Sequence, residues 1–197
     1  MNREFPPLSL RGRRVVRSLQ HRRETTMKLQ SLHQLYVQHL QDLLGMERQI
    51  KASLPGWIKT ANDEDLKSAL KNHLQNTIWQ IERLNDMLRR HGAKREGLAC
   101  PGIQSLLSQT DQVAPIHGEL ILRDLHLISH CQRIEHFEIA SYGAARTMAE
   151  RLNEEADAEL LITTMQEEST LDDELTSIAT ILLSLLDPSL TLNGALT

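Results

Sequence analysis

The sequence predicts an all-α fold, a four-helix bundle made of two antiparallel hairpins joined by a long crossover. Three observations lead to this fold class. Four long segments repeat apolar residues at helical spacing, no segment alternates as a strand would, and the links between the segments differ greatly in length. Aromatic residues make up only 3% of the 197 residues and hydrophobic residues 40%, which suits helices packed through Leu, Ile and Ala better than a β-sandwich.

The first two helices are predicted from their apolar stripes and end signals. Helix one is expected over about residues 28–60, with a stripe of Leu32, Tyr36, Leu40, Leu43, Ile50 and Leu54. Asn62 is a favourable N-cap for helix two, and the acidic run 63–65 suits the positive end of the helix dipole. Helix two then extends to about His91, because Gly92 is a typical residue just beyond a helix end.

The remaining helices and the links determine the topology. Helix three is expected over about residues 118–151, where Gly143 suggests close helix packing, and Asn153 is expected to cap a fourth helix that ends near Leu186. The links between helices one and two and between helices three and four are each a few residues long, which predicts two antiparallel hairpins. The link over residues 93–117 contains one short amphipathic piece, "IQSLLSQT", and is long enough to cross the bundle. This is the ferritin-like arrangement of four helices.

Both ends of the chain are predicted to lie outside the bundle. Residues 1–27 carry seven arginines against two glutamates. Such a segment fits an arm for nucleic acid or an acidic membrane, an Arg-rich targeting segment, a disordered tail, or translated upstream sequence before a start at Met27. The last two are favoured because a helical pattern begins directly after Met27. Residues 187–197 are expected to form a loose tail, and the net charge of −4 gives no reason to expect nucleic-acid binding by the whole chain.

Cysteine content and hydropathy favour a cytoplasmic protein without a membrane span. Cys100 and Cys131 do not form a disulfide framework, and a reducing compartment is therefore expected. The longest apolar run, "IATILLSLL", falls well short of the roughly 18 residues that a transmembrane helix needs.

Polar residues interrupt every stripe near the middle of its helix. The interruptions are Glu47 on helix one; His73, Thr77 and Gln80 on helix two; Glu135 and Glu138 on helix three; and Glu168 on helix four. Because a helix rises 1.5 Å per residue, these positions fall at about one height when the midpoints are aligned. Carboxylates from three helices in a dry layer cost several kcal/mol per ion (order of magnitude) unless they bind a cation, take up protons or line a wet cavity.

Iron or manganese is the expected cation, because oxygen-rich clusters with one or two imidazoles are typical of those metals. Two alternatives stay open. Individual acids can lie at the edge of a stripe and point to solvent, and His73 can be a core histidine as readily as a ligand.

Four stretches carry a resemblance to a known family. They are "LYVQHLQDLLGMERQI", "NHLQNTIWQIERL", "CQRIEHFEIASYGAAR" and "EESTLDDEL", and together they span residues 28–182. The chain resembles the ferritin-like family of bacterial YciE/YciF-type stress proteins. The resemblance implies a ferritin-like fold, a homodimer and a link to stress responses, and it implies a candidate site more firmly than a reaction.

Comparison with ferritin-like di-iron proteins defines a candidate metal site. Their pattern has a Glu on two helices and Glu-x-x-His on the other two. Glu47 matches a lone Glu, Glu138 or Glu135 matches the Glu of helix three, and Glu168 matches that of helix four. Helix two departs from the pattern, because Thr77-x-x-Gln80 stands where the pattern has Glu-x-x-His, and Gln80 also departs from the resembling family, which has Thr and His there. Helix four has Leu171 in place of His.

The predicted metal residues are therefore Glu47, Glu135, Glu138 and Glu168, with His73. Two functions follow. The first is a metal-binding ferritin-like stress protein with oxidase or peroxide-reducing activity. The alternative is a non-catalytic structural or oligomerising stress protein whose metal site is degenerate.

Overall fold

The described part of the protein is entirely helical. The computed structural model describes residues 29–114 and 116–186, so the predicted tails over residues 1–27 and 187–197 lie outside the described residues. The chain divides into two units, residues 1–30 and 31–197, and the helices belong to the second. They are α2 (Leu32–Thr60), α3 (Glu64–Arg90), α4 (Pro101–Asp111), α5 (Leu120–Leu152) and α6 (Glu155–Leu185). No strand occurs in the described ranges, which confirms the all-α prediction.

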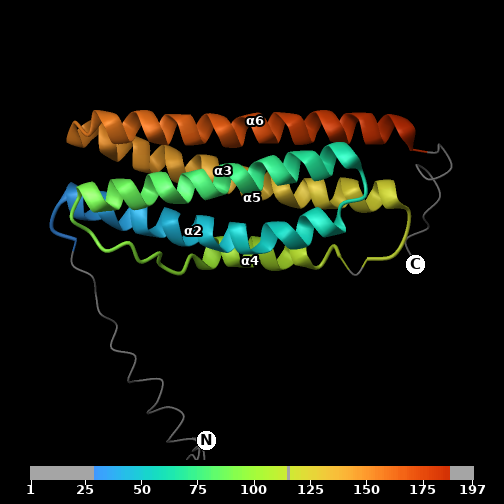
Figure 1. Ribbon diagram of the computed structural model, residues 1–197, viewed down its shortest axis with the longest axis horizontal. Coiled ribbons are helices and arrows are strands. Elements are labelled where there is room, and N and C mark those ends of the chain that lie inside the picture. Colours follow the sequence, from blue (N-terminus) through green and yellow to red (C-terminus); the bar gives the residue numbers. More distant parts are fainter. Residues whose placement is uncertain (1–28, 115, 187–197) are drawn as a thin grey trace, which may run out of the picture. The chain divides into compact units, whose positions relative to one another are not determined.

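The four long helices pack side by side as two antiparallel pairs. Helix α2 runs against α3, and α5 runs against α6 (Figure 1). The pairs meet where α2 packs on α5 and α3 packs on α6, so each long helix has two long neighbours. The short helix α4 lies within the link between α3 and α5 and packs against α2 and α5. The link thus returns the chain to the end of the molecule at which α2 ends and α3 begins (Figure 1).

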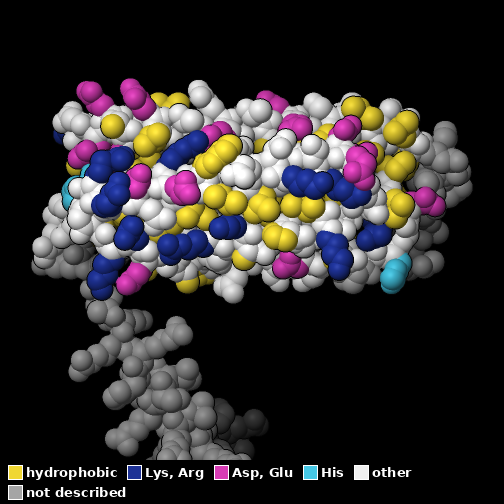
Figure 2. All heavy atoms as spheres, viewed as in Figure 1, with side chains coloured by type: hydrophobic (Ala, Val, Ile, Leu, Met, Phe, Trp, Pro, Cys, Tyr) yellow, Lys and Arg dark blue, Asp and Glu magenta, His cyan; other side chains and the backbone are white. Residues whose placement is uncertain are grey.

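The core follows the predicted stripes with small corrections. The largest fully buried side chains include Tyr36 of α2 and Tyr142 of α5. Leu32 was expected on the core stripe but is 37% exposed, because α2 begins at that residue and the stripe reaches the interior only at Tyr36. Basic, acidic and apolar side chains are interspersed over the face formed by α2 and α3 (Figure 2).

Two of the predicted caps were wrong. One was misplaced by a single position, and the other belongs to the preceding helix. The N-cap of α3 is Asp63 rather than Asn62, and its carboxylate accepts the Leu66 amide at 2.9 Å. Asn153 does not begin α6; it ends α5 in the left-handed conformation, with φ 58° and ψ 32°. Asn tolerates that conformation better than most residues, so it can end a helix as well as begin one. Gly92, with φ 62°, follows the end of α3 as predicted.

The close backbone approach in this fold involves Gly45 rather than Gly143. A Cβ on Gly45 would lie 1.7 Å from the carbonyl oxygen of Leu98, and a Cβ on Gly97 would lie 2.7 Å from the Cα of Gly45. The start of the crossover therefore lies directly on the backbone of α2. A Cβ on Gly143 would make only ordinary contact with Met165, at 3.6 Å, so the predicted reason for that glycine was wrong.

A buried aspartate ties the two hairpins together near each end of the helices. Asp124 of α5 accepts the backbone amides of Asn62 and Asp63 at 2.9 and 2.8 Å, in the turn between α2 and α3. Asp157 of α6 accepts from the Tyr36 hydroxyl at 2.8 Å and contacts His91 at 2.8 Å. These groups satisfy polar atoms that would otherwise be buried without partners.

Across the described ranges, no helix carries an apolar stretch long enough to cross a bilayer.

Candidate metal centre

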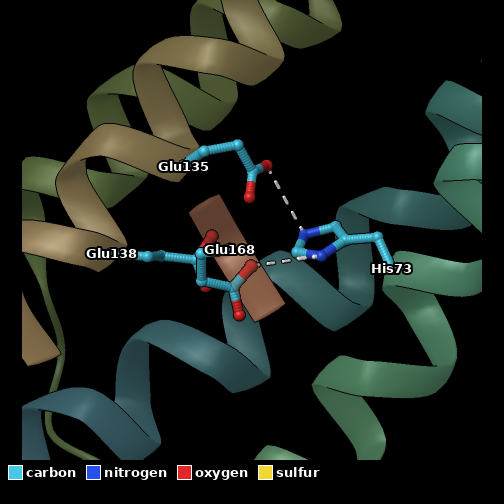
Figure 3. Close-up of side chains that lie close together, drawn as sticks. All are labelled: His73, Glu135, Glu138 and Glu168. Carbon is cyan, nitrogen blue, oxygen red and sulfur yellow. Dashed lines mark ion pairs between the residues drawn. The ribbon is translucent and has the colours of Figure 1, made fainter. Parts of the chain in front are cut away.

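Four of the predicted residues meet at the centre of the helices. His73 of α3, Glu135 and Glu138 of α5, and Glu168 of α6 each offer one ligand atom, and these atoms all lie within 4.8 Å of one another. All four side chains are buried. The carboxyl groups and the imidazole point toward one another from three helices (Figure 3). The prediction that acids on separate helices share one height is therefore confirmed for these residues.

The imidazole of His73 lies between two carboxyl groups without bonding closely to either. Its Nε2 is 3.7 Å from Glu135 Oε1, and its Nδ1 is 3.5 Å from Glu168 Oε2. Both separations exceed an ordinary hydrogen bond. The hydroxyl of Thr77, one turn along α3, donates instead to the His73 carbonyl oxygen at 2.8 Å. This bond uses only the backbone of His73 and leaves both ring nitrogens to face the centre.

Several polar atoms of the centre have no hydrogen-bond partner. They are Nε2 of His73, Oε2 of Glu135, both carboxyl oxygens of Glu138 and Oε2 of Glu168. Each such buried atom costs about 1–3 kcal/mol when it remains unsatisfied. The atoms converge, and carboxylate oxygens with an imidazole nitrogen form a ligand set suited to iron or manganese. The residues present therefore fit a cation of this kind.

Glu47, the fifth predicted residue, lies beside this group rather than within it. Its side chain is fully buried on α2, and its carboxyl group interacts with that of Glu138. The Tyr142 hydroxyl donates a hydrogen bond of 2.6 Å to Oε1 of Glu47. The other oxygen, Oε2, has no partner. Glu47 thus extends the acidic layer toward α2 and leaves one oxygen free.

On α3, the centre is bounded by the Gln80 amide, whose nitrogen is bonded and whose buried oxygen has no partner. Nε2 of Gln80 donates to Oε1 of Glu168 and, at 3.1 Å, to Oε2 of Glu167. Arg83, one turn further on, forms two bonds of 2.7 Å with the carboxylate of Glu167. A neutral amide is a poor ligand for iron compared with imidazole, so Gln80 orients Glu168 and is not itself a strong ligand.

Burial sets the protonation of the centre. Burial, reinforced by the charge of Glu168, raises the pKa of Glu47 to about 8 despite the hydrogen bond from Tyr142. Burial likewise raises the pKa of Glu168 to about 7 and holds those of Glu135 and Glu138 well above the ordinary value. Burial lowers the pKa of His73 to about 4. In the absence of a cation, burial therefore favours the protonated form of the carboxyl groups and the neutral form of the imidazole.

The sequence analysis missed two supporting residues. Tyr142 lies one turn after Glu138 on the core stripe, and a buried tyrosine hydroxyl needs a partner, which was the available signal. Arg83 pairs with Glu167 of another helix, and no local pattern indicates such a pair. His136, which follows Glu135 in the sequence, lies outside the centre, with its side chain 68% exposed beside Asp172.

Comparison with known proteins places the chain in a family. Residues 31–185 match the profile of a family described as a domain of unknown function, DUF892. The chain belongs to this family. It is also 30% identical over 154 residues to Protein YciF of Escherichia coli K12, an alignment that covers 78% of this chain and 93% of YciF. The resemblance drawn from the four sequence stretches is confirmed.

Solved structures share the fold of this chain. The crystal structure of the E. coli stress protein YciF matches with a TM-score of 0.76 and 29% identity, over 79% of this chain and 99% of that one. YcfI of Rhodopseudomonas palustris matches with a TM-score of 0.73 and 32% identity, over 77% and 96%. A protein of Xanthomonas campestris, with a TM-score of 0.59 and 20% identity over 79% and 98%, shares the fold alone.

Proposed function

We propose that this member of the YciF-like stress protein family is a ferritin-like four-helix bundle that binds iron or manganese at its centre. The observation that carries the proposal is the buried group of His73, Glu135, Glu138 and Glu168, whose ligand atoms lie within 4.8 Å of one another and include several without partners. Four convergent ligands from three rigid helices need little rearrangement to hold a cation.

Each side chain has a distinct part in the proposed site. Glu138 has two free oxygens, so it suits a ligand shared between two cations. The neutral imidazole of His73 presents a lone pair to the centre, and Glu135 and Glu168 supply oxygens on either side of it. Glu47 serves as a ligand to a second cation or as the acid that holds a proton beside Glu138, with its Oε1 fixed by Tyr142.

The proposed reaction is an oxidase or peroxide-reducing one. Bound iron or manganese would supply redox chemistry and an open coordination position for oxygen or peroxide. The protein's own contribution is a dry setting, since all the carboxyl groups named are at most 1% exposed. Glu47, whose Oε1 accepts from the Tyr142 hydroxyl, can hold a proton on its other oxygen, Oε2, beside the centre.

The alternative proposal is a non-catalytic structural or oligomerising stress protein. It is favoured by Gln80, which already bonds to Glu168, and by Leu171, which provides no ligand where the ferritin-like pattern has His. The related YcfI of R. palustris is described as a candidate structural protein. Under this proposal the buried acids remain protonated and no cation is taken up.

Metal analysis of freshly purified protein separates the two proposals. Protein produced with iron and manganese supplied should retain metal at the centre, and Glu138→Ala should lower the metal content. Iron-dependent oxygen or peroxide consumption by the wild type, absent in Glu138→Ala, would support catalysis. Full-length protein that holds no metal after iron supplementation would overturn the metal-binding proposal and favour the structural one.

We further propose a cytoplasmic homodimer, since the family resemblance implies a dimer and the two cysteines are free in the structure. Light scattering tests the dimer.

A third proposal, the least supported, is nucleic-acid binding by the arginine-rich N-terminal segment. It requires salt-sensitive DNA binding that disappears on deletion of residues 1–26.

A further inference from the structure

A polar groove between α3 and α6 leads down to the candidate metal centre. Its cavity is about 280 Å³ in volume and is lined from α3 by Asn72, His73 and Asn76 and from α6 by Thr163, Gln166 and Thr170, among others. Asn72 and Gln166 are exposed, whereas the side chain of His73 is only 1% exposed. The groove therefore opens to solvent and ends at an imidazole that belongs to the centre.

The groove is open because of the residues at the seam between the two helices. On α3 the lining positions are 69, 72, 73 and 76, and on α6 they include 163, 166, 167 and 170, so both sets follow one helical face. These positions hold Ala, Asn, His, Thr, Gln and Glu, and Leu171 is the one large apolar side chain in the lining. The small and polar side chains leave the seam open, with room for several water molecules.

The charge around the groove is acidic. Glu167 and Glu174 are among the lining residues, and no lysine or arginine is. Arg83 neutralises Glu167 by its paired bonds, but Glu174 is exposed. The amide and hydroxyl oxygens of Asn72, Asn76 and Thr170 supply further acceptors. Oxygen acceptors with acidic charge suit a hydrated cation and disfavour an anion.

The opposite side of the molecule differs. A cavity of about 290 Å³ between α2, α5 and the start of α4 is lined mainly by apolar side chains, including Leu43, Met46 and Phe137. None of the five candidate metal residues lines it. Of these two cavities, the one between α3 and α6 is the more polar, carries acidic side chains and contacts the centre through His73.

We propose that the groove between α3 and α6 is the access route by which a hydrated divalent cation reaches the centre, with His73 as the first ligand it meets. This rests on the proposed metal-binding function. The side-chain oxygens of Asn72, Asn76 and Thr170 would contact the hydrated cation on its way to the imidazole and the carboxyl groups. The route makes loading sensitive to groove residues that bind nothing at equilibrium.

Stopped-flow loading of the metal-free, full-length protein with Co²⁺, followed by its visible absorption, tests the route. Asn76→Trp fills the groove and should slow loading by about tenfold or more, the effect of a modestly higher barrier, without changing the final Co²⁺ content. Asn76→Ala removes one groove oxygen without filling the groove, so it should slow loading far less than Asn76→Trp does. Ser141→Trp places the same bulk in the opposite cavity and should also leave the rate unchanged.

A charge variant tests the same route without filling the groove. Glu174→Lys lies on the surface and should slow loading by about twofold to tenfold at low ionic strength, with the difference lost at high salt. If neither Asn76→Trp nor Glu174→Lys changes the loading rate, or if Ser141→Trp slows loading instead, the proposed route is wrong and the proposed function still stands. A wild type that binds no Co²⁺ at equilibrium would overturn both.

Discussion

Replacing Glu138 by leucine should stabilise the metal-free protein. The side chain is fully buried, neither carboxyl oxygen accepts from a donor group, and the group lies against the equally buried carboxyl group of Glu47. An unsatisfied buried group costs about 1–3 kcal/mol, and exchanging buried charged groups for apolar ones of similar size is often stabilising by about 1–4 kcal/mol. Glu138→Leu should therefore raise the free energy of unfolding by about 2–4 kcal/mol at pH 8, and the melting temperature by about 5–15 °C.

The pH dependence of this gain follows from the direction of the pKa shift. Burial raises the pKa of Glu138 above its ordinary value, so the folded wild type binds a proton more tightly than the unfolded chain does. The wild type consequently loses stability as the pH rises from the ordinary carboxyl pKa toward the raised one. The advantage of Glu138→Leu should be largest near pH 8 and should shrink toward pH 5.

Thermal and urea unfolding of metal-free wild type and variant at both pH values measure the effect. Glu159→Leu on the exposed face of α6 is the matched control and should change stability by less than about 0.5 kcal/mol. A Glu138→Leu protein that is less stable than the wild type when both are metal-free would refute the reasoning, because it would mean that the carboxyl oxygens are satisfied in solution. Iron or manganese should reverse the order, stabilising the wild type more than the variant.

Three further substitutions have defined outcomes. Gly45→Ala should destabilise the fold by about 2 kcal/mol or more, because its Cβ would meet the Leu98 carbonyl oxygen at 1.7 Å; urea unfolding measures this, and a neutral result would contradict the close approach. Gln80→His should raise Fe²⁺ or Mn²⁺ affinity by about tenfold in competitive titrations, by adding an imidazole beside Glu168; unchanged affinity would show that this position does not face a bound cation. Asp157→Asn should cost about 3 kcal/mol, since it removes the charge that holds the end of α3, and a melting temperature equal to the wild-type value would rule that role out.

The main features of the fold could be predicted because they depend on local patterns. Apolar spacing located the four long helices, and the length of the link over residues 93–117 indicated the crossover. The cap of α3 was misplaced by one residue because Asn62 and Asp63 are both good caps. Asn153 was assigned to the wrong helix because asparagine favours both helix ends.

The candidate site could be predicted only in outline. Helical rise placed Glu47, Thr77, Glu135, Glu138 and Glu168 at one height, and the structure brings the last three together with His73, which lies one turn before Thr77. The sequence could not show that Glu47 lies beside that group, because its place depends on the rotation of α2. Partnerships such as Tyr142 with Glu47 depend on tertiary packing, and their members lie far apart in the chain.

The two buried aspartates described above belong to the second hairpin and satisfy hydrogen-bonding groups of the first. Asp124 of the second hairpin closes the turn of the first, and Asp157 holds the opposite ends of the same two helices. A fragment that ends before α5 would leave the turn amides of Asn62 and Asp63 without these acceptors and the Tyr36 hydroxyl without its own. Folding should accordingly be a single cooperative event in which neither half forms first as a finished unit. The buried acids of the centre are therefore brought together only when the whole set of helices assembles.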